Sequence, residues 1–319
     1  MTCPICKSTQ TKYFTKKDNY IFYRCSNCMT LFLSTLPSQK QLKNYYVKQF
    51  SYRDGLLNEE NIRKRGRVIL RKIKQLVPNA KTIVDVGCGY GFFLDEAQKQ
   101  GVSVFGVEPS RLLVHYAFNK YAIRSFRGTL NELVKNNKRK FDVVTCIHVI
   151  EHVTELKYFV LDLLKLVKPG GLLYIETPNA DSHLLYTEKE QYTFLIPPDH
   201  LWLFSRRSIQ YLLPKNAQIV FLNTYSYSEH FMGIVKRTIK NLSYFERPAC
   251  RQGRSEKSSV STSLDSSAIP LNDNAFVIMN IVRKKMFYFL FDRLLAPLFT
   301  GLLNSYHKGS ILELYIKKK

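Results

Sequence analysis

The chain has 319 residues, of which 45% are apolar and 23% are charged, a composition typical of globular proteins. This composition excludes a wholly disordered chain, a collagen-like repeat and a small disulfide-framed domain. The 48 Lys and Arg residues outnumber the 25 Asp and Glu residues, which gives a formal net charge of +23 and raises the question of a polyanionic partner such as nucleic acid or an acidic membrane surface.

The excess positive charge is unevenly distributed along the chain. Residues 1–75 carry a net charge of +12, residues 76–227 carry +3 and residues 228–319 carry +8, so a nearly neutral centre is flanked by two basic ends. Seven cysteines are too few for a secreted disulfide framework of this length, and the first residues lack the charged and apolar regions of a signal peptide. We therefore expect a reducing, cytoplasmic location.

Four of the cysteines form two C-x2-C pairs within residues 1–35. They are Cys3, Cys6, Cys25 and Cys28, with 18 residues between the pairs. This spacing is typical of a zinc ribbon, in which four thiolates hold one structural Zn²⁺ in a closed tetrahedral site. Strands are expected at Tyr20–Cys25 and Thr30–Leu33, on either side of the second pair. The alternative interpretation is four unrelated reduced thiols.

Residues 36–77 are rich in Lys, Arg, Tyr and Leu and predict a basic helical linker. The densest basic cluster is the run Arg63-Lys-Arg-Gly-Arg67, which is followed by Arg71, Lys72 and Lys74. Such a run is either a solvated helix face or a surface that binds anions.

From residue 78 onward, strand-like apolar runs alternate with helical segments. The expected strands are Thr82–Val86, Val102–Val107, Phe141–Ile147, Leu172–Glu176, Gln218–Thr224 and Ser310–Ile316. The expected helices are Phe92–Gln100, Ser110–Lys120, Glu155–Val167 and Ser205–Leu213, the third of them ended by Lys168-Pro-Gly-Gly171. The alternation predicts an α/β fold with a doubly wound, parallel sheet.

Residues 228–307 are expected to form a partly helical insertion before the last strand. Its serine-rich stretch Arg254–Ser267 predicts a mobile loop. The apolar stretch Met286–Leu303 predicts an amphipathic helix. It is not expected to span a membrane, because charged residues and a proline interrupt it. Peripheral contact with a membrane surface stays open for this helix.

The strongest chemical signal is Asp85-Val-Gly-Cys-Gly-Tyr-Gly91, at the end of the first strand of the sheet. Its three glycines allow a tight turn and a close approach of the backbone to a ligand. Glu108 ends the next strand, where a carboxylate can accept both hydroxyls of a ribose, the alternative being a solvated strand end. A dinucleotide-binding fingerprint would place its third glycine at position 92, which is Phe92.

The pattern D-x-G-x-G-x-G instead resembles motif I of the class I methyltransferases that use S-adenosylmethionine. The segments Phe141–His152, Leu166–Asn179 and Pro197–Ser205 are similar, in the same order, to motifs of the small-molecule branch that includes the ubiquinone-pathway O-methyltransferase. The resemblance implies a Rossmann-like, seven-stranded methyltransferase domain at residues 78–227 and 308–319. An N-terminal zinc ribbon joined to such a domain also occurs in bacterial methyltransferases of sugar, polysaccharide and natural-product pathways.

The resemblance also implies which residues bind the S-adenosylmethionine. The loop contacts come from Asp85, Gly87, Cys88, Gly89 and Gly91, the ribose ligand is Glu108, the adenine lies near Thr129 and Leu130, and Ile147 and His148 pass beside the sulfonium. Cys88 and Cys146 are interpreted as small buried residues and not as nucleophiles.

Two histidines are candidates for the general base that deprotonates the acceptor, because the pKa of histidine lies close to neutral pH. They are His152, with a structural hydrogen bond as its alternative role, and His200, with substrate anchoring as its alternative. Glu151 is expected to cap the helix that begins nearby. Three aromatic residues are expected either to line the acceptor pocket or to belong to the core: Tyr192, Trp202 and Phe204.

The leading hypothesis is an S-adenosylmethionine-dependent methyltransferase acting on an oxygen or a carbon of a small molecule. Its acceptor would be a sugar, nucleotide-sugar, quinone-like or natural-product compound, and the basic ends would attract an anionic one. The second hypothesis is a zinc-ribbon RNA methyltransferase whose basic flanks follow phosphates, although Thr145–His148 lacks the Asn/Asp-Pro-Pro-aromatic tetrad used on base amines. The third is a binding protein without catalysis, against which the intact glycine loop and Glu108 argue.

Overall fold

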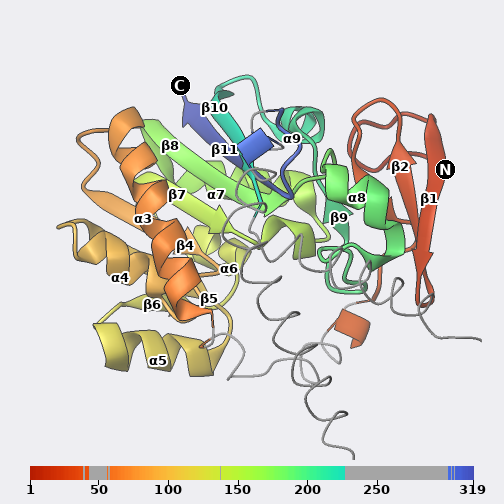
Figure 1. The fold of residues 1–319 in the computed structure, drawn as a ribbon. Helices are drawn as coiled ribbons and strands as arrows, with labels where there is room; N and C mark the ends of the chain where they lie inside the picture. The colour runs from red at the N-terminus through yellow and green to blue at the C-terminus, as the bar shows by residue number, and fades with distance from the viewer. Residues whose placement is uncertain are drawn as a thin grey trace, which may run out of the picture. The chain divides into compact units, whose positions relative to one another are not determined.

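The computed structural model describes residues 1–38, 40–42, 56, 58–136, 138–226, 301–302, 304 and 306–319. By its internal contacts the chain divides into two units, and Met1–Tyr225 together with Leu303–Lys319 make up the first (Figure 1). The expected serine-rich loop, and the expected helix Met286–Leu303 apart from residues 301–302, lie outside the described residues. The fold below is that of the first unit.

A seven-stranded sheet forms the centre of this unit, with strand order β10-β11-β8-β7-β4-β5-β6. Its strands are β4 (Thr82–Val86), β5 (Ser103–Glu108), β6 (Ser125–Arg127), β7 (Phe141–Ile147), β8 (Val167–Pro178), β10 (Ala217–Tyr225) and β11 (Ile311–Lys318). The five strands from β6 to β8 run parallel, and β11 is antiparallel to both of its neighbours. This arrangement confirms the predicted α/β class and the Rossmann-like, seven-stranded sheet.

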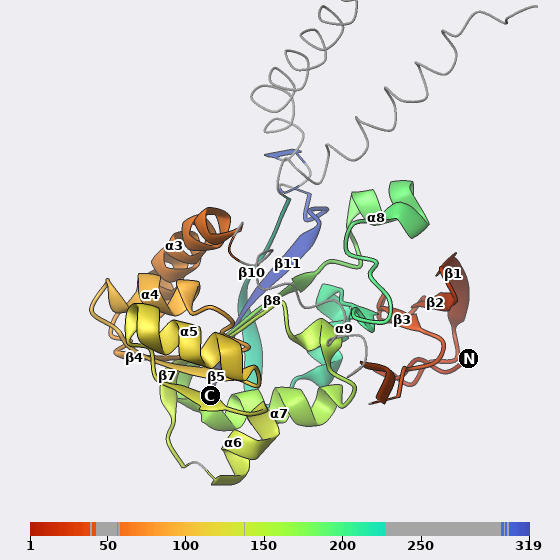
Figure 2. The same ribbon diagram turned by 90° about the horizontal axis from the view of Figure 1, so that it is seen from below.

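Helices cover both faces of the sheet: Figure 2 shows α3, α4 and α5 on one face and α6 and α7 on the other. The helices are α3 (Glu59–Leu76), α4 (Phe92–Gln98), α5 (Arg111–Tyr121), α6 (Leu130–Asn136), α7 (Leu156–Leu166), α8 (His183–Glu188) and α9 (Arg206–Leu212), with short 3-10 helices η1 (Ile150–His152) and η2 (Lys189–Gln191). Ser110 accepts a hydrogen bond from the backbone N–H of Leu113 and caps α5. Within the described part of the chain, no helix has the length and apolar character needed to cross a membrane.

The junction between α7 and β8 differs from the prediction. Strand β8 begins at Val167, directly after the helix, so Lys168–Gly171 lie within the strand and do not form the separate loop that was expected. Val167 pairs with Phe141, and Leu172 pairs with Val143. The four residues between these pairs bulge out of the ladder, and Gly170 provides the positive φ of 72° that the bulge needs.

A smaller antiparallel sheet contains the cysteine pairs, in the order β1-β2-β3-β9. Its strands are β1 (Thr11–Lys17), β2 (Tyr20–Cys25), β3 (Leu31–Leu33) and β9 (Trp202–Leu203). The first three belong to the ribbon, and the fourth comes from the segment that follows β8. Strands β2 and β3 were expected from the sequence, but β1 was not. Strand β1 has one buried residue, Thr15, and therefore little of the apolar alternation that identifies a strand.

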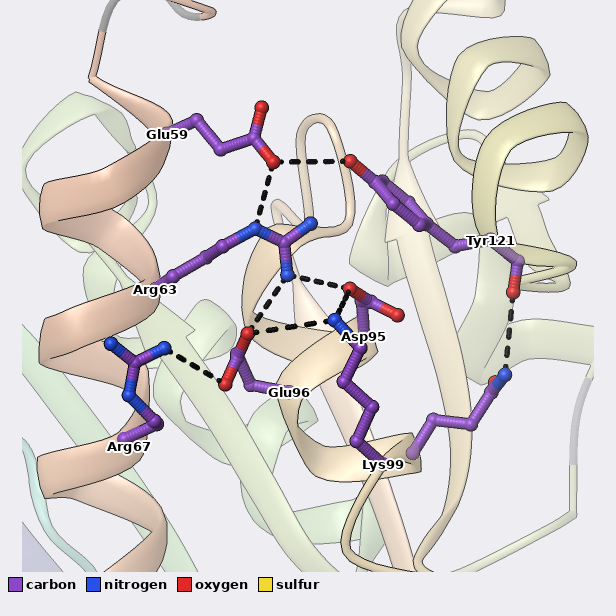
Figure 3. A network of polar contacts seen from close by, with 8 residues as sticks. Glu59, Arg63, Arg67, Asp95, Glu96, Lys99 and Tyr121 are labelled. Atoms are coloured by element: carbon purple, nitrogen blue, oxygen red, sulfur yellow. Dashed lines mark hydrogen bonds and ion pairs between the residues drawn. The ribbon is translucent and has the colours of Figure 1, made fainter.

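Helix α3 joins the core of the large sheet through one face. Its Ile69, Leu70 and Ile73 pack in the same buried cluster as residues of β4, β7 and β8. On its polar side, Arg63 pairs with Glu59 and with Asp95 and Glu96 of α4 (Figure 3). Arginines of the basic run are thus engaged in ion pairs within the chain.

Candidate functional site

The parallel strands bring the predicted site residues to one edge of the large sheet. Val86 of β4 lies opposite both Val107 of β5 and Cys146 of β7, and Ile147 lies opposite Glu176 of β8. The glycine loop, Glu108 and His148 follow these paired residues directly. They therefore meet at the carboxyl edge of the sheet, where ligands bind in open α/β sheets.

A side chain would be unfavourable at each of the three loop glycines, but its surroundings would differ from one position to the next. All three have positive φ, of 79° at Gly87, 52° at Gly89 and 81° at Gly91. A Cβ atom would come within 2.3 Å of Val149 Cγ2 at Gly87 and within 2.9 Å of Ile123 Cδ1 at Gly91. At Gly89 no described heavy atom would lie within 4 Å of it. The loop thus leaves space beside Gly89 that a ligand can fill.

Glu108 lies directly against this loop. It is 7% exposed, so it is not the solvated strand end that was the alternative. Its two carboxylate oxygens accept hydrogen bonds from the backbone N–H groups of Gly89, at 3.1 Å, and Ser110, at 2.9 Å. Burial raises the pKa of Glu108, and the two N–H groups favour its charged form. An oriented carboxylate therefore stands next to the open space at Gly89.

The segment predicted to lie near an adenine is close to Glu108 in the fold. The N–H of Gly128 donates to the carbonyl of Glu108 at 3.2 Å. Thr129, which follows it, donates its N–H to the Glu132 carboxylate at 2.7 Å. Leu130 is 4% exposed. Both residues thus begin α6 beside the end of β5.

Asp85 and Cys88 are buried beneath the glycine loop. Asp85 accepts a hydrogen bond from the hydroxyl of Thr145 at 2.6 Å. Burial, together with the charges of Glu108 and Glu176, raises the pKa of Asp85 to about 7. The Cys88 sulfur lies 3.8 Å from the Ser125 hydroxyl, and burial raises the pKa of its thiol. Cys88 therefore packs as a small buried residue, as does the fully buried Cys146.

His148 follows β7 with a positive φ of 53°. Its Nδ1 is 3.1 Å from Glu151 Oε1 and its Nε2 is 3.5 Å from Glu176 Oε1. Burial lowers the pKa of His148, but the two carboxylates outweigh this effect and raise it to about 10. The ring also stacks on Phe194, with 6.1 Å between the ring centres. At neutral pH His148 is therefore a clamped imidazolium.

The expectation that Glu151 caps a nearby helix is wrong. The side chain is fully buried, and its second oxygen accepts a hydrogen bond from the Thr177 hydroxyl at 2.9 Å. Burial raises its pKa, but His148 and the other neighbouring histidines lower it to about 2. The residue that precedes α7 is Glu155, whose side chain makes no capping hydrogen bond. Glu151 points inward, where it pairs with His148 and the Thr177 hydroxyl.

The two candidate bases, His152 and His200, lie side by side with their ring centres 4.9 Å apart. Nδ1 of His152 is 2.8 Å from the carboxylate of Asp199, which raises the pKa of His152 although burial lowers it. Nδ1 of His200 is 2.7 Å from the carbonyl oxygen of Phe194. A carbonyl can only accept, so this Nδ1 carries the hydrogen and Nε2 holds the lone pair. Burial lowers the pKa of His200.

Donor atoms of Glu151, His152 and His200 lie within 4.8 Å of one another. Both oxygens of Glu151 already accept hydrogen bonds, from His148 and Thr177. We therefore interpret this group as part of a hydrogen-bond network and not as a metal site. The three aromatic residues considered for the acceptor pocket are at most 1% exposed and belong to the core. These are Tyr192, Trp202 and Phe204.

Sequence reasoning missed three charged residues around this site: Arg65, Glu176 and Asp199. Asp199 directly precedes His200, and this adjacency was the signal that could have identified it. Glu176 ends a predicted strand, as Glu108 does, at the same edge of the sheet. Arg65 gave no local signal, because its partners Glu176 and Glu313 are far away in the sequence.

The four cysteine sulfurs of the ribbon converge as their spacing predicts. All four lie within 4.8 Å of one another, with 3.6 Å between Cys3 and Cys28 and 3.5 Å between Cys6 and Cys25. A tetrahedron with Zn–S bonds of about 2.3 Å has S–S edges of about 3.8 Å, whereas a disulfide bond is about 2.05 Å long. The donor set and its spacing therefore fit one metal ion.

Comparison with known proteins identifies the central part of the chain. Residues 61–218 match the family model of a methyltransferase domain. The chain is 28% identical to a ubiquinone biosynthesis O-methyltransferase of Coxiella burnetii over 131 residues, which are 39% of this chain and 56% of that protein. It is 29% identical to the protein of the same name from Rickettsia bellii over 160 residues, which are 48% of this chain and 64% of that protein. The matches therefore span less than two thirds of these relatives.

Among solved structures, a SAM dependent methyltransferase from Archaeoglobus fulgidus is similar to this chain with a TM-score of 0.48 and 16% sequence identity. The match covers 84% of this chain and 100% of the other.

Proposed function

The chain belongs to the class I S-adenosylmethionine-dependent methyltransferases, and we propose that it methylates an oxygen, or a carbon, of a small molecule. The acceptor class is a sugar, nucleotide-sugar, quinone-like or natural-product compound. The observation that carries the proposal is the open space at Gly89 beside the buried, hydrogen-bonded carboxylate of Glu108.

These residues fit S-adenosylmethionine by shape and by chemistry. A ribose beside Gly89 would place its hydroxyls against Glu108, whose oxygens can accept two hydrogen bonds. Asp85, Cys88 and the glycine backbone would line the methionine part, and Ile147 and His148 would lie beside the sulfur. Bound S-adenosylmethionine supplies a methyl group on a positively charged sulfur. The chain's part is then to align the acceptor and to exclude water.

The proton of an acceptor hydroxyl needs a base, and the His152–His200 pair can provide one. His200 is neutral at neutral pH and offers the lone pair of Nε2, because its Nδ1 donates to Phe194. Asp199 holds His152 beside it and favours the charged form of that ring, so Nε2 of His200 is the nitrogen of the pair that accepts the proton. His148 does not serve as the base, since it is already protonated between two carboxylates.

The internal ion pairs of the densest basic run argue against RNA as the acceptor. Arg63, Arg65 and Arg67 of the densest basic run pair with carboxylates of the same chain, so their charge is neutralised locally. An intact cofactor space likewise favours catalysis over a binding protein without activity. For the ribbon, we propose that the four thiolates hold one structural Zn²⁺.

Binding of S-adenosylhomocysteine, measured by calorimetry, tests the proposal. The full chain should bind it, and Glu108→Ala should weaken binding about 100-fold, because two hydrogen bonds to a charged group are lost. Glu155→Ala is the matched control and should bind as the native chain does. The absence of binding by the folded native chain would contradict the proposal.

The acceptor class has its own test, in which methyl-labelled S-adenosylmethionine is added to the protein with a cell extract. Label is expected in low-mass compounds. Label in RNA, together with RNA binding that weakens steeply with salt, would instead favour the RNA methyltransferase.

A further inference from the structure

A buried charged cluster lies beneath the proposed methyl-transfer position, and nothing in the proposed function uses it. The side chain of Arg65 from α3 is 11% exposed and that of Glu176 from β8 is 2% exposed. Nε and Nη2 of Arg65 lie 3.0 and 2.9 Å from Glu176 Oε2. Nη2 also contacts the Tyr174 hydroxyl and the carboxylate of Glu313. Buried charges are costly unless they are fully paired, so the arrangement of this cluster is tightly constrained.

Glu176 connects this cluster to the site because its two oxygens face different partners. Oε2 is held by Arg65, while Oε1 accepts a hydrogen bond from the Tyr225 hydroxyl at 2.7 Å and faces Nε2 of His148 at 3.5 Å. The other ring nitrogen of His148 faces Glu151. Charges therefore alternate from Arg65 through Glu176 and His148 to Glu151, in one series of contacts.

This series ends at the carboxyl edge of the sheet, beside the glycine loop. Without the guanidinium on Oε2, the Glu176 carboxylate keeps the hydroxyls of Tyr174 and Tyr225 but loses its charged partner on that side, so it can shift and loosen one side of the clamp on His148. We propose that Arg65 is a positioning residue of the methyl-transfer site, which acts through Glu176 to hold the His148 ring in place. Its catalytic meaning rests on the proposed function, whereas the contact series itself does not.

The same helix provides a matched control in Arg63. Its side chain is 14% exposed and pairs with three carboxylates, those of Glu59, Asp95 and Glu96 (Figure 3). These partners lie on α3 and α4, away from His148. Replacing Arg63 by Gln removes a comparable set of buried ion pairs without touching Glu176, so it separates a general loss of stability from a specific loss of positioning.

The test is the ¹H–¹⁵N spectrum of the histidine side chains in the full chain, with His148 assigned by its disappearance in His148→Gln. The native ring should show two protonated nitrogens at neutral pH. In Arg65→Gln we expect the His148 signals to shift and broaden, because the carboxylate that faces Nε2 is no longer held by the guanidinium, while Arg63→Gln leaves them unchanged. Native His148 signals in folded Arg65→Gln would overturn the proposal.

A second variant keeps the test decisive if Arg65→Gln does not fold. Arg65→Gln combined with Glu313→Gln removes the carboxylate that the first change leaves without its guanidinium, and should show the same shift of the His148 signals. Native signals in this folded double variant would overturn the proposal equally.

A kinetic cycle then asks whether Arg65 acts through His148. We expect Arg65→Gln to lower kcat about tenfold, and to have no further effect once His148 is already Gln. Independent effects of the two changes would contradict the proposed route. The spectra need no acceptor, so they can fail or succeed separately from the methyltransferase proposal.

Discussion

The ribbon sheet and the seven-stranded sheet are held together by different interactions. Strands β7 and β8 of the large sheet are buried along most of their length, and helices pack on both faces. In the ribbon, β1 buries a single residue, and Phe22 of β2 shares its small core with β3 and the cysteines. A sheet this small buries too little apolar surface to be stable alone. The ribbon therefore depends on its four thiolates, and the large sheet on its core.

The two regions meet at β9, which is part of the ribbon sheet and follows the segment with Asp199 and His200. Leu203 pairs with Leu31 of β3, and the hydroxyl of Ser205 donates to the carbonyl of Cys28 at 2.6 Å. Just before β9, the N–H of Leu201 donates to the carbonyl of Glu151 at 2.9 Å. The ribbon thus supports the segment that leads into β9. This segment begins with Asp199 and His200.

The largest effect is expected from Cys28→Ser, which removes one of the four thiolates proposed to hold Zn²⁺. Metal binding by such sites contributes about 10–16 kcal/mol to folding, and apart from its cysteines the ribbon relies on a small core and on its pairing with β9. We expect the amides of β1 and β2 to lose most of their protection in hydrogen exchange followed by mass spectrometry. The amides of β4 and β7 should keep theirs, because the apolar core is untouched.

Two results would break this comparison between the regions. Native protection of β1 and β2 in Cys28→Ser would show that the ribbon does not need its thiolates. Loss of protection in β4 and β7 as well would show that the two sheets unfold together. Cys250→Ser, a change outside the two cysteine pairs, is the control and should leave all four strands protected.

An intermediate effect is expected within the large sheet, at two glycines of one loop. Gly87→Ala places a Cβ against Val149 at positive φ, so we expect the free energy of unfolding to fall by about 2–4 kcal/mol from backbone strain and overpacking. Gly89→Ala has strain without the clash and should cost about 1–2 kcal/mol. Urea unfolding measures both values.

Cofactor binding should separate the same two variants. The Cβ of Gly89→Ala enters the open space, so S-adenosylhomocysteine should bind at least tenfold more weakly than expected from stability alone. Equal stability of the two variants would contradict the packing argument, and native affinity in Gly89→Ala would contradict the location of the ligand space.

Features with a short-range signal could be predicted from the sequence. The two C-x2-C pairs predicted the convergence of four sulfurs, and the runs Thr82–Val86 and Phe141–Ile147 matched β4 and β7 to the residue. The loop from Asp85 to Gly91 could be placed because a buried strand precedes it and a helix follows. In each case neighbouring residues carry both the structural preference and the chemistry.

Features that depend on distant partners could not be predicted. The run around Arg65 has the composition of a solvated basic helix, and its ion pairs with Glu176 and Glu313 exist only once β8 and β11 lie side by side. Glu151 similarly has the position of a helix cap, but its side chain is buried and pairs with His148 and Thr177. Strand β9 has two residues, too few for a pattern, and forms because β3 offers it an edge.

The smallest effect is expected at Asp142, whose carboxylate connects two neighbouring strands and Lys168. Its carboxylate accepts hydrogen bonds from the N–H and hydroxyl of Thr82, at 2.9 and 2.7 Å, and from Lys168 at 2.8 Å. Burial raises the pKa of Asp142, but these partners outweigh it and lower the pKa from 3.8 to about 2. Asp142 therefore stabilises the fold only while it is ionised.

Asp142→Asn should lower the free energy of unfolding at pH 7 by about 1–2 kcal/mol, after allowance for the partial exposure of the side chain. Because the folded pKa lies below the unfolded one, the contribution is fully present above about pH 4 and disappears as the pH falls towards 2. Urea unfolding of both proteins between pH 3 and pH 7 measures this. The exposed Asp18→Asn is the control, and a difference independent of pH would show that the charge of Asp142 is not what stabilises the strand edge.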